Sequence, residues 1–392
     1  MRHAMPAPLR IALFSGNYNY VRDGANQALN RLVAFLLAQG HAVRIYSPTT
    51  ATPAFEPAGD LISLPACAIP RRPEYRFPTH LPASVKRDLA AFAPDIVHIS
   101  SPDIAAHRAV SWARRRKIAV VASVHTRFET YLTYYHLELL EPALRAILRR
   151  LYGKCDALLV PAESTAAVLR AQRMNRTIFL WSRGVDRQQF NPERRDLAWR
   201  RGLGISDDQV VIVFLGRLVL EKGLDVFSDA IDVLTARGVA HKVLVIGEGP
   251  ARAWFEERLP DAIFTGQLVG PDLARAFASA DIFLNPSVTE SFGNVTLEAM
   301  ACALPVVAAS ATGATNIVRD GETGTLVEPG EVEQFADALE RYATDPALRR
   351  DHAAHGLAWA ETQDWDRINA AVERAYYRVI ERRARIARVL ER

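Results

Sequence analysis

The sequence lacks the features that define several large protein classes. Its 392 residues include only three cysteines, Cys67, Cys155 and Cys302, whose spacing suits neither a metal site nor a disulfide scaffold. No apolar run reaches the ~18 residues that a transmembrane helix needs, and residues 1–10 lack the apolar centre of a secretory signal. We therefore expect a protein of a reducing, cytoplasmic compartment without a membrane-spanning helix.

Short motifs of familiar chemistries are also missing. No P-loop, GxSxG, protein-kinase or zinc-ligand pattern occurs. Gly16 and Gly24 follow the first expected strand, but they lie too far apart for a GxGxxG fingerprint, which argues against a nicotinamide enzyme. The acidic D-x-D of Asp364 and Asp366 opens an expected helix rather than ending a strand, so we do not interpret it as a metal site.

The sequence does contain a regular alternation of short apolar runs and amphipathic segments. Residues 9–15 and 42–46 are expected strands on either side of an expected helix at 25–39. This unit recurs as far as residue 180 and again from residue 210 to residue 327. The pattern predicts the α/β class, with doubly wound parallel sheets.

Composition divides this alternation into two domains. The polar stretch 190–204 is the expected linker, so we place the domains at 1–191 and 205–365. Within the first domain, residues 53–82 are rich in proline and are expected to form an irregular loop that presents Tyr75 and Arg76 for contacts.

The net charge of +4 conceals an asymmetry. Residues 1–190 hold 25 Lys and Arg against 13 Asp and Glu, a net of +12, and the remainder has a net of −8. The expected helix at 139–152 adds to this, because it carries apolar residues on one side and Arg145, Arg149 and Arg150 on the other. An anionic lipid surface or nucleic acid would suit such a half; a solvated basic face is the simpler alternative.

The most informative stretch is Ser287–Met300, which follows an expected buried strand and runs into an expected helix from Val295. Gly293 and Asn294 lie at the helix start, where backbone N–H groups attract phosphate. Glu290 and Glu298 lie on either side of that start, and carboxylates pair well with sugar hydroxyls. The stretch therefore suits a sugar nucleotide, and a surface loop with two solvated glutamates is the alternative.

Three further positions lie near expected strand ends, where ligands of such folds bind. Arg217 and Lys222 follow the first strand of the second domain and could neutralise a pyrophosphate, although solvated charges are also common there. His125 ends a strand of the first domain, where it could contact a sugar or be a purely structural histidine.

With these residues assembled, the chain resembles the retaining GT-B glycosyltransferases of family 4 over nearly its whole length. Glu290 to Met300 resembles that family's E-x7-E motif, and Gly216 to Gly223 resembles its pyrophosphate-binding segment. A narrower resemblance, to the branch of GDP-mannose-dependent mannosyltransferases and sulfoquinovosyl-diacylglycerol synthases, is carried by Pro73-Glu74-Tyr75-Arg76, Ser100-Ser101-Pro102, His125-Thr126-Arg127-Phe128, Tyr131-Leu132 and Trp181-Ser182-Arg183-Gly184-Val185-Asp186.

The resemblance implies roles for these residues. Glu298 would hold the nucleotide ribose, and Arg217 and Lys222 the diphosphate. The remaining donor contacts would come from Glu290, His125, Gly24 and the backbone of Phe292, Gly293 and Asn294. The chain departs from the family by having Asp23 before Gly24, where a second glycine is usual, and an aspartate near the diphosphate would be unfavourable unless it points away or binds the acceptor.

The resemblance also implies the architecture and the reaction. Two Rossmann-like domains would face one another across a cleft, and residues 366–392 would cross back to the first domain, with Trp365 at the start of that docking. The enzyme would transfer a hexose from a nucleotide sugar, with retention and without a metal. We expect a membrane-lipid acceptor and peripheral attachment to the inner membrane face, with contacts from Tyr75, Arg76, Arg127, Arg145, Arg149 and Arg150.

Two alternatives remain from the sequence. One is a glycosyltransferase with a soluble sugar or metabolite as acceptor. The other is a non-catalytic protein that binds anions or nucleic acid through its basic half, although we expect no nucleic-acid partner.

Overall fold

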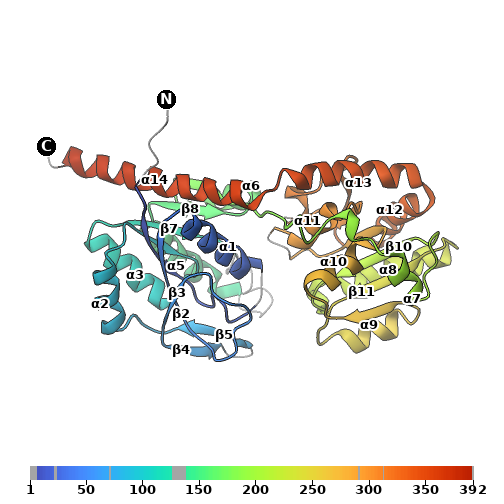
Figure 1. Ribbon diagram of the computed structural model, residues 1–392, viewed down its shortest axis with the longest axis horizontal. Helices are drawn as coiled ribbons and strands as arrows, with labels where there is room; N and C mark the ends of the chain where they lie inside the picture. Colours follow the sequence, from blue (N-terminus) through green and yellow to red (C-terminus); the bar gives the residue numbers. More distant parts are fainter. Residues whose placement is uncertain are drawn as a thin grey trace. The chain divides into compact units, whose positions relative to one another are not determined.

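The structure is a computed structural model that describes residues 7–21, 24–69, 72–125, 138–289, 292–311 and 313–390. The chain forms two compact units (Figure 1). The first consists of Met1–Ser182 and Asp366–Arg392, and the second of Arg183–Trp365. Residues 183–191, which we expected in the first domain, therefore belong to the second unit.

The first unit is built on a seven-stranded parallel sheet with the order β3-β2-β1-β6-β7-β8-β9. Its strands are short and almost entirely apolar, as strands covered on both faces must be. They are β1 (Arg10–Phe14), β2 (Ala42–Ser47), β3 (Asp60–Ser63), β6 (Ile96–Ile99), β7 (Ala119–Ser123), β8 (Ala157–Val160) and β9 (Ile178–Leu180).

The helices of this unit alternate with its strands along the chain, apart from the last helix, which returns from the end of the chain. They are α1 (Gly24–Ala38), α2 (Ala83–Phe92), α3 (Ile104–Arg115), α5 (Glu141–Tyr152), which follows a 3-10 turn (Glu138–Leu140), α6 (Glu163–Ala171) and, from the end of the chain, α14 (Trp365–Leu390). The return of α14 to the first unit agrees with the resemblance. Trp365, the first residue of α14, falls in the second unit, where a Cβ atom at Gly184 would be 2.8 Å from its ring. Its predicted role in the docking stays a prediction.

The proline-rich stretch 53–82 is not the irregular loop that its composition predicts. It contributes β3 to the main sheet and then forms an antiparallel hairpin of β4 (Ala66–Ile69) and β5 (Arg72–Pro78). Proline lacks a backbone N–H, so it weakens a central strand but is tolerated on an edge. In a two-stranded hairpin both strands are edges, and the prediction was wrong for this reason.

The second unit has a six-stranded parallel sheet with the order β12-β11-β10-β13-β14-β15. Its strands are β10 (Val211–Leu215), β11 (Lys242–Ile246), β12 (Ile263–Gly266), β13 (Ile282–Asn285), β14 (Val306–Ala309) and β15 (Gly324–Val327). The helices are α7 (Leu197–Gly202), α8 (Leu224–Ala236), α9 (Arg252–Arg258), α10 (Gly270–Ala278), α11 (Asn294–Ala301), α12 (Val332–Thr344) and α13 (Pro346–Glu361).

The stretch 190–204 is part of this unit and not a free linker. It contains α7, and the side chain of Arg200 is fully buried. The Arg200 guanidinium donates to the Ser279 carbonyl at 2.9 Å and pairs with Asp281 at 2.8 Å. A buried arginine whose two terminal nitrogens both donate hydrogen bonds fixes this segment against the sheet, and its polar composition concealed that role.

Candidate active site

The strand order of the second unit makes the carboxyl ends of β10 and β13 the candidate ligand-binding position. The chain runs outward from β10 on one side and from β13 on the other, and ligands of such sheets bind beyond the strand ends where the order reverses. The loop after β10 holds the predicted cations, and the loop after β13 holds the predicted motif. The two segments that the sequence singled out are therefore neighbours.

The loop after β10 presents the two cations differently. The side chain of Arg217 is exposed, whereas Lys222 is half-buried at the end of a 3-10 turn (Leu220–Lys222). Gly223 follows in the left-handed region, with φ 73°, and a Cβ atom there would lie 3.0 Å from the Pro286 carbonyl oxygen. A glycine thus allows the β10 and β13 loops to approach closely.

The loop after β11 packs even more tightly against the same segment. A Cβ atom at Gly247 would lie 1.9 Å from the Gly216 carbonyl oxygen, and one at Gly249 would lie 2.3 Å from that of Leu218. The Leu218 N–H also donates to the Glu248 carbonyl at 3.0 Å. Both glycines are needed for this backbone contact.

The loop after β13 leads into α11 as the motif predicts. Gly293 adopts φ 91° and ψ 53° immediately before the helix, and the Thr289 hydroxyl donates to the Glu221 carbonyl at 3.2 Å, which ties this loop to the β10 loop. The Oδ1 atom of Asn294 is buried and has no hydrogen-bond partner in the described part of the chain. A buried polar atom without a partner at a helix start is typical of a ligand site.

Of the two motif glutamates, Glu298 is among the described residues. Glu298 is half-buried on α11, close enough to Cys302 that its carboxylate adds to the effect of burial in raising the pKa of that thiol. Phe292 is buried. Glu290 lies outside the described residues, so its predicted contact with the donor sugar stays a prediction.

In the first unit the strand order reverses between β1 and β6. Gly16 follows β1, and a Cβ atom there would lie 3.2 Å from the Ser101 hydroxyl. That hydroxyl donates to the Asp103 carboxylate at 2.5 Å, and burial raises the Asp103 pKa to about 6. The sequence gave no signal for Asp103, because a helix-capping aspartate is common on surfaces.

The other predicted residues of this unit lie on neighbouring elements. His125 is buried just after β7, with its ring 5.1 Å from that of Trp181. Gly24 is the first residue of α1. Asp23 and Arg127 lie outside the described residues, so nothing here bears on the glycine-loop departure or on the predicted acceptor contact of Arg127.

The β4–β5 hairpin is fixed to the loop after β1. The Asn17 side chain accepts from the Arg76 N–H at 2.7 Å and donates to the Arg76 carbonyl at 3.0 Å. The Arg76 guanidinium donates to the Tyr20 hydroxyl at 3.2 Å. Arg76 and the half-buried Tyr75 are thus positioned beside the loop that leads to Gly24.

Helix α5 exposes both apolar and basic side chains. Leu148 and Leu151 pack into the core, but Leu140 and Ile147 are about half exposed, at 53% and 52%. The Arg145 side chain pairs with Glu141, that of Arg149 donates to the Gln172 carbonyl at 3.1 Å, and Arg150 is exposed. The predicted apolar face is therefore divided between the core and the surface.

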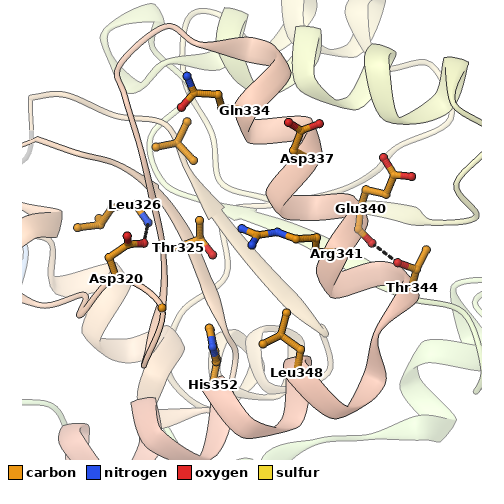
Figure 2. A pocket seen from close by; sticks show the side chains of 12 residues that line it. Asp320, Thr325, Leu326, Gln334, Asp337, Glu340, Arg341, Thr344, Leu348 and His352 are labelled. Atoms are coloured by element: carbon orange, nitrogen blue, oxygen red, sulfur yellow. Dashed lines mark hydrogen bonds between the residues drawn. The ribbon is translucent and has the colours of Figure 1, made fainter.

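A separate hollow of about 960 Å³ lies on the second unit between β15, α12 and α13 (Figure 2). Figure 2 shows Arg341 extending into it below the carboxylates of Asp337 and Glu340. None of its lining residues belongs to the β10 or β13 loops. Its acidic rim would repel a diphosphate, so charge favours the ends of β10 and β13 over this hollow as the candidate donor site.

Two negative findings apply to the residues that the structure describes. None of their helices is both long enough and apolar enough to cross a bilayer. No three of their His, Cys, Asp or Glu side chains gather as ligands for a metal ion. The expectation of a metal-free reaction stays a prediction.

Comparison with known proteins agrees with this geometry. The family profile described as Glycosyltransferase Family 4 matches residues 22–189, and the profile described as Glycosyl transferases group 1 matches residues 209–345. A GDP-mannose-dependent alpha-mannosyltransferase of Mycolicibacterium smegmatis is 32% identical, over 89% of this chain and 91% of that protein. A sulfoquinovosyl transferase of Arabidopsis thaliana is 29% identical, over 95% of this chain and 74% of that protein.

The fold also matches a solved structure. The sucrose-phosphate synthase from Thermosynechococcus elongatus superimposes with a TM-score of 0.77 at 21% identity, covering 95% of this chain and 99% of that chain. The fold and the sequence relatives lead to the same assignment. The chain belongs to family 4 of the GT-B glycosyltransferases.

Proposed function

We propose that this glycosyltransferase moves a hexose from a GDP- or UDP-linked donor to a hydroxyl group of a membrane lipid, with retention of the anomeric configuration. The observation that carries the donor part is the junction of the β10 and β13 loops. There the Thr289 hydroxyl donates to the Glu221 carbonyl, which keeps the segment of Arg217 and Lys222 beside the start of α11.

The chemistry of that junction suits a nucleoside diphosphate sugar. Two cations and a helix start are a strong combination for a diphosphate. The Glu298 carboxylate, half-buried and inside the helix, would accept from the ribose hydroxyls. Glu290, eight residues earlier, would contact the transferred sugar. GDP is the first nucleotide to test, because two relatives that are 31% and 32% identical to this chain are named GDP-mannose-dependent alpha-mannosyltransferases.

The proposed reaction needs no protein nucleophile. The bond between the anomeric carbon and the diphosphate oxygen breaks, and the acceptor oxygen bonds to the same face of that carbon. The acceptor proton passes to the departing diphosphate, so the products are a glycoside and a nucleoside diphosphate. Arg217 and Lys222 would stabilise the negative charge that develops on the leaving group, which is usually the largest catalytic effect in such sites.

Two surfaces of the first unit support a lipid acceptor. Helix α5 exposes Ile147, and the 3-10 turn before it exposes Leu140, beside basic side chains, a composition typical of helices that lie in a membrane interface. The Asn17 and Tyr20 contacts position Arg76 near the start of α1, where it could meet a lipid headgroup. The enzyme would then attach peripherally to an anionic cytoplasmic leaflet.

A thermal-shift screen tests the donor part. A ligand that binds only the folded protein raises its unfolding temperature by mass action. We expect GDP or UDP, together with its hexose conjugate, to raise the unfolding temperature more than ADP. No shift with any of the three nucleotides or their conjugates would contradict the donor assignment. Turnover without any lipid would instead favour a soluble acceptor.

A further inference from the structure

The ring of His125 packs edge to face against a large neighbour, the indole of Trp181. His125 follows β7 and Trp181 follows β9, the two strands on either side of β8. Their ring centroids are 5.1 Å apart and their planes are inclined at 68°, an edge-to-face contact. Both side chains are buried, at 8% and 1% exposure. The orientation of the imidazole therefore depends on the position of the indole.

Trp181 is itself fixed by the sheet and by α14. Its backbone N–H donates to the Val160 carbonyl at 2.7 Å, which extends the pairing of β8 and β9. Its indole Nε1–H donates to the Asn369 side chain at 3.3 Å, and Asn369 is 1% exposed. Asn369 lies on the part of α14 that packs on the first unit (Figure 1).

A second histidine lies on another side of the indole. The ring of His98 is 6.1 Å from that of Trp181, again edge to face, and its Nδ1 atom lies 2.7 Å from the Tyr376 hydroxyl of α14. The indole is thus in contact with two histidine rings and is hydrogen-bonded to Asn369 of α14. Little room is left for it to rotate.

We propose that Trp181 is a positioning residue for His125, and that α14 fixes Trp181 through the hydrogen bond from its indole to Asn369. The consequence for catalysis rests on the proposed function, in which His125 contacts the donor sugar. The end of the chain would then act on the reaction through two side chains, and not only by stabilising the fold.

The competing interpretation is that these contacts merely dock α14. The chain offers a matched control, because Glu373 on the same helix pairs with His41 at 2.9 Å and has no contact with Trp181 or His125 among those described. Glu373→Gln weakens docking alone. Asn369→Leu weakens docking and also releases the indole.

Kinetics separate the two interpretations. With GDP-mannose as donor and dispersed dioleoylglycerol as acceptor, we expect kcat to fall ~10-fold in Asn369→Leu and ~100-fold in Trp181→Leu, since small misplacements of reacting groups cost rates of this order. Trp181→Phe keeps an aromatic ring, so its kcat should lie between those of the wild type and Trp181→Leu. The donor KM should change little, because the cations of the second unit are untouched. Equal losses in Glu373→Gln and Asn369→Leu would overturn the proposal.

A spectroscopic measurement decides the positioning even without turnover. In the full chain labelled with 13C-histidine, the His125 signal is assigned by its loss in His125→Ala. We expect that signal to move in Trp181→Phe and Asn369→Leu and to stay in place in Glu373→Gln. An unmoved signal would overturn the proposal. A moved signal together with full activity of His125→Ala would leave the positioning standing and remove only the proposed role of His125.

Discussion

The two cations after β10 illustrate how single residues carry the proposed chemistry. Arg217 is exposed in the loop after β10, and Lys222 is half-buried on the 3-10 turn that Gly223 ends. A cation that is preorganised beside a leaving group stabilises the transition state more than the bound substrate. Both residues should therefore affect turnover more than folding.

Removing either cation should raise the activation barrier. We expect Arg217→Ala and Lys222→Ala each to cost ~2–4 kcal/mol of transition-state stabilisation, or ~30- to 1000-fold in kcat/KM. Steady-state kinetics with the donor that binds in the thermal screen measures this. Arg350→Ala, an exposed arginine on α13, is the control and should keep wild-type rates. Full turnover by both site variants would contradict the assigned roles.

Asp103 makes a second prediction at this scale, about stability. Its carboxylate caps α3 by accepting from the Ala106 N–H at 2.8 Å, and burial raises its pKa from 3.8 to about 6. The folded state therefore binds a proton more tightly than the unfolded state. The stabilisation is present below pH 3.8 and is lost as the pH rises through about 6.

Asp103→Asn removes this titration while keeping a good capping residue. Relative to the wild type, the variant should gain ~2–3 kcal/mol in the free energy of unfolding between pH 4 and pH 7.5, because a shift of one pKa unit corresponds to about 1.4 kcal/mol. Urea unfolding of both proteins at the two pH values measures the difference. The contributions of other titrating groups are the same in both proteins and cancel in the comparison. The same difference at both pH values would mean that Asp103 does not titrate in this range.

Helix α11 shows the contribution of a whole element. It begins immediately after a glycine at φ 91°, a conformation that costs other residues roughly 1–2 kcal/mol. A Cβ atom at Gly293 would make only ordinary contacts, at 3.4 Å, with Ile317 and Thr296. A substitution there should therefore act through the backbone, by moving the N–H groups at the helix start.

Gly293→Ala should consequently weaken both the fold and the nucleotide site. We expect a loss of ~1–2 kcal/mol in the free energy of unfolding and a several-fold weaker affinity for GDP or UDP. Gly330→Ala is the matched control, since Gly330 has φ 83° and open space around its Cα. It should lose similar stability and keep its nucleotide affinity by calorimetry. Equal nucleotide affinities in the two variants would mean that the start of α11 does not bind the nucleotide.

The helices and strands that have a clear apolar pattern could be predicted from the sequence, and those without one were missed. The strands of both sheets other than β3 are short apolar runs, and helices such as α8 show strong periodicity. Helix α13 was missed because its buried face consists of His352, Ala353, Gly356 and Ala360, which give no apolar stripe. The β4–β5 hairpin was missed because of its prolines.

Candidate site segments could be located from the sequence only where one segment carries the chemistry. The motif around Gly293 and the cations after β10 are each local, so the sequence placed them after the correct strands, and their roles stay predictions. The neighbours of His125 and the close packing of Gly247 on Gly216 depend on strand order and register, which bring together residues that are far apart in the chain. Periodicity along a single sequence does not specify that order.

For the whole molecule, charge divides the chain more sharply than the sequence halves suggest. Because α14 belongs to the first unit, that unit has 31 Lys and Arg against 16 Asp and Glu, a net of +15, and the second has a net of −11. The non-catalytic alternative no longer explains this asymmetry, since the chain belongs to a family of enzymes. An anionic membrane surface, as proposed for the acceptor, does explain it.

That explanation predicts a local effect and not only an effect of net charge. We expect the wild type to float with vesicles containing phosphatidylglycerol, and Arg149→Gln with Arg150→Gln on α5 to bind ~30-fold more weakly, at ~1 kcal/mol for each charge near the surface. Lys86→Gln with Arg87→Gln removes the same charge from exposed positions on α2 and should bind nearly as the wild type does. Higher salt should weaken all binding by screening. If the two double variants lost the same vesicle affinity, attachment would depend on the net charge of the whole first unit and not on α5. If the wild type did not float with the vesicles, the proposed membrane attachment would be wrong.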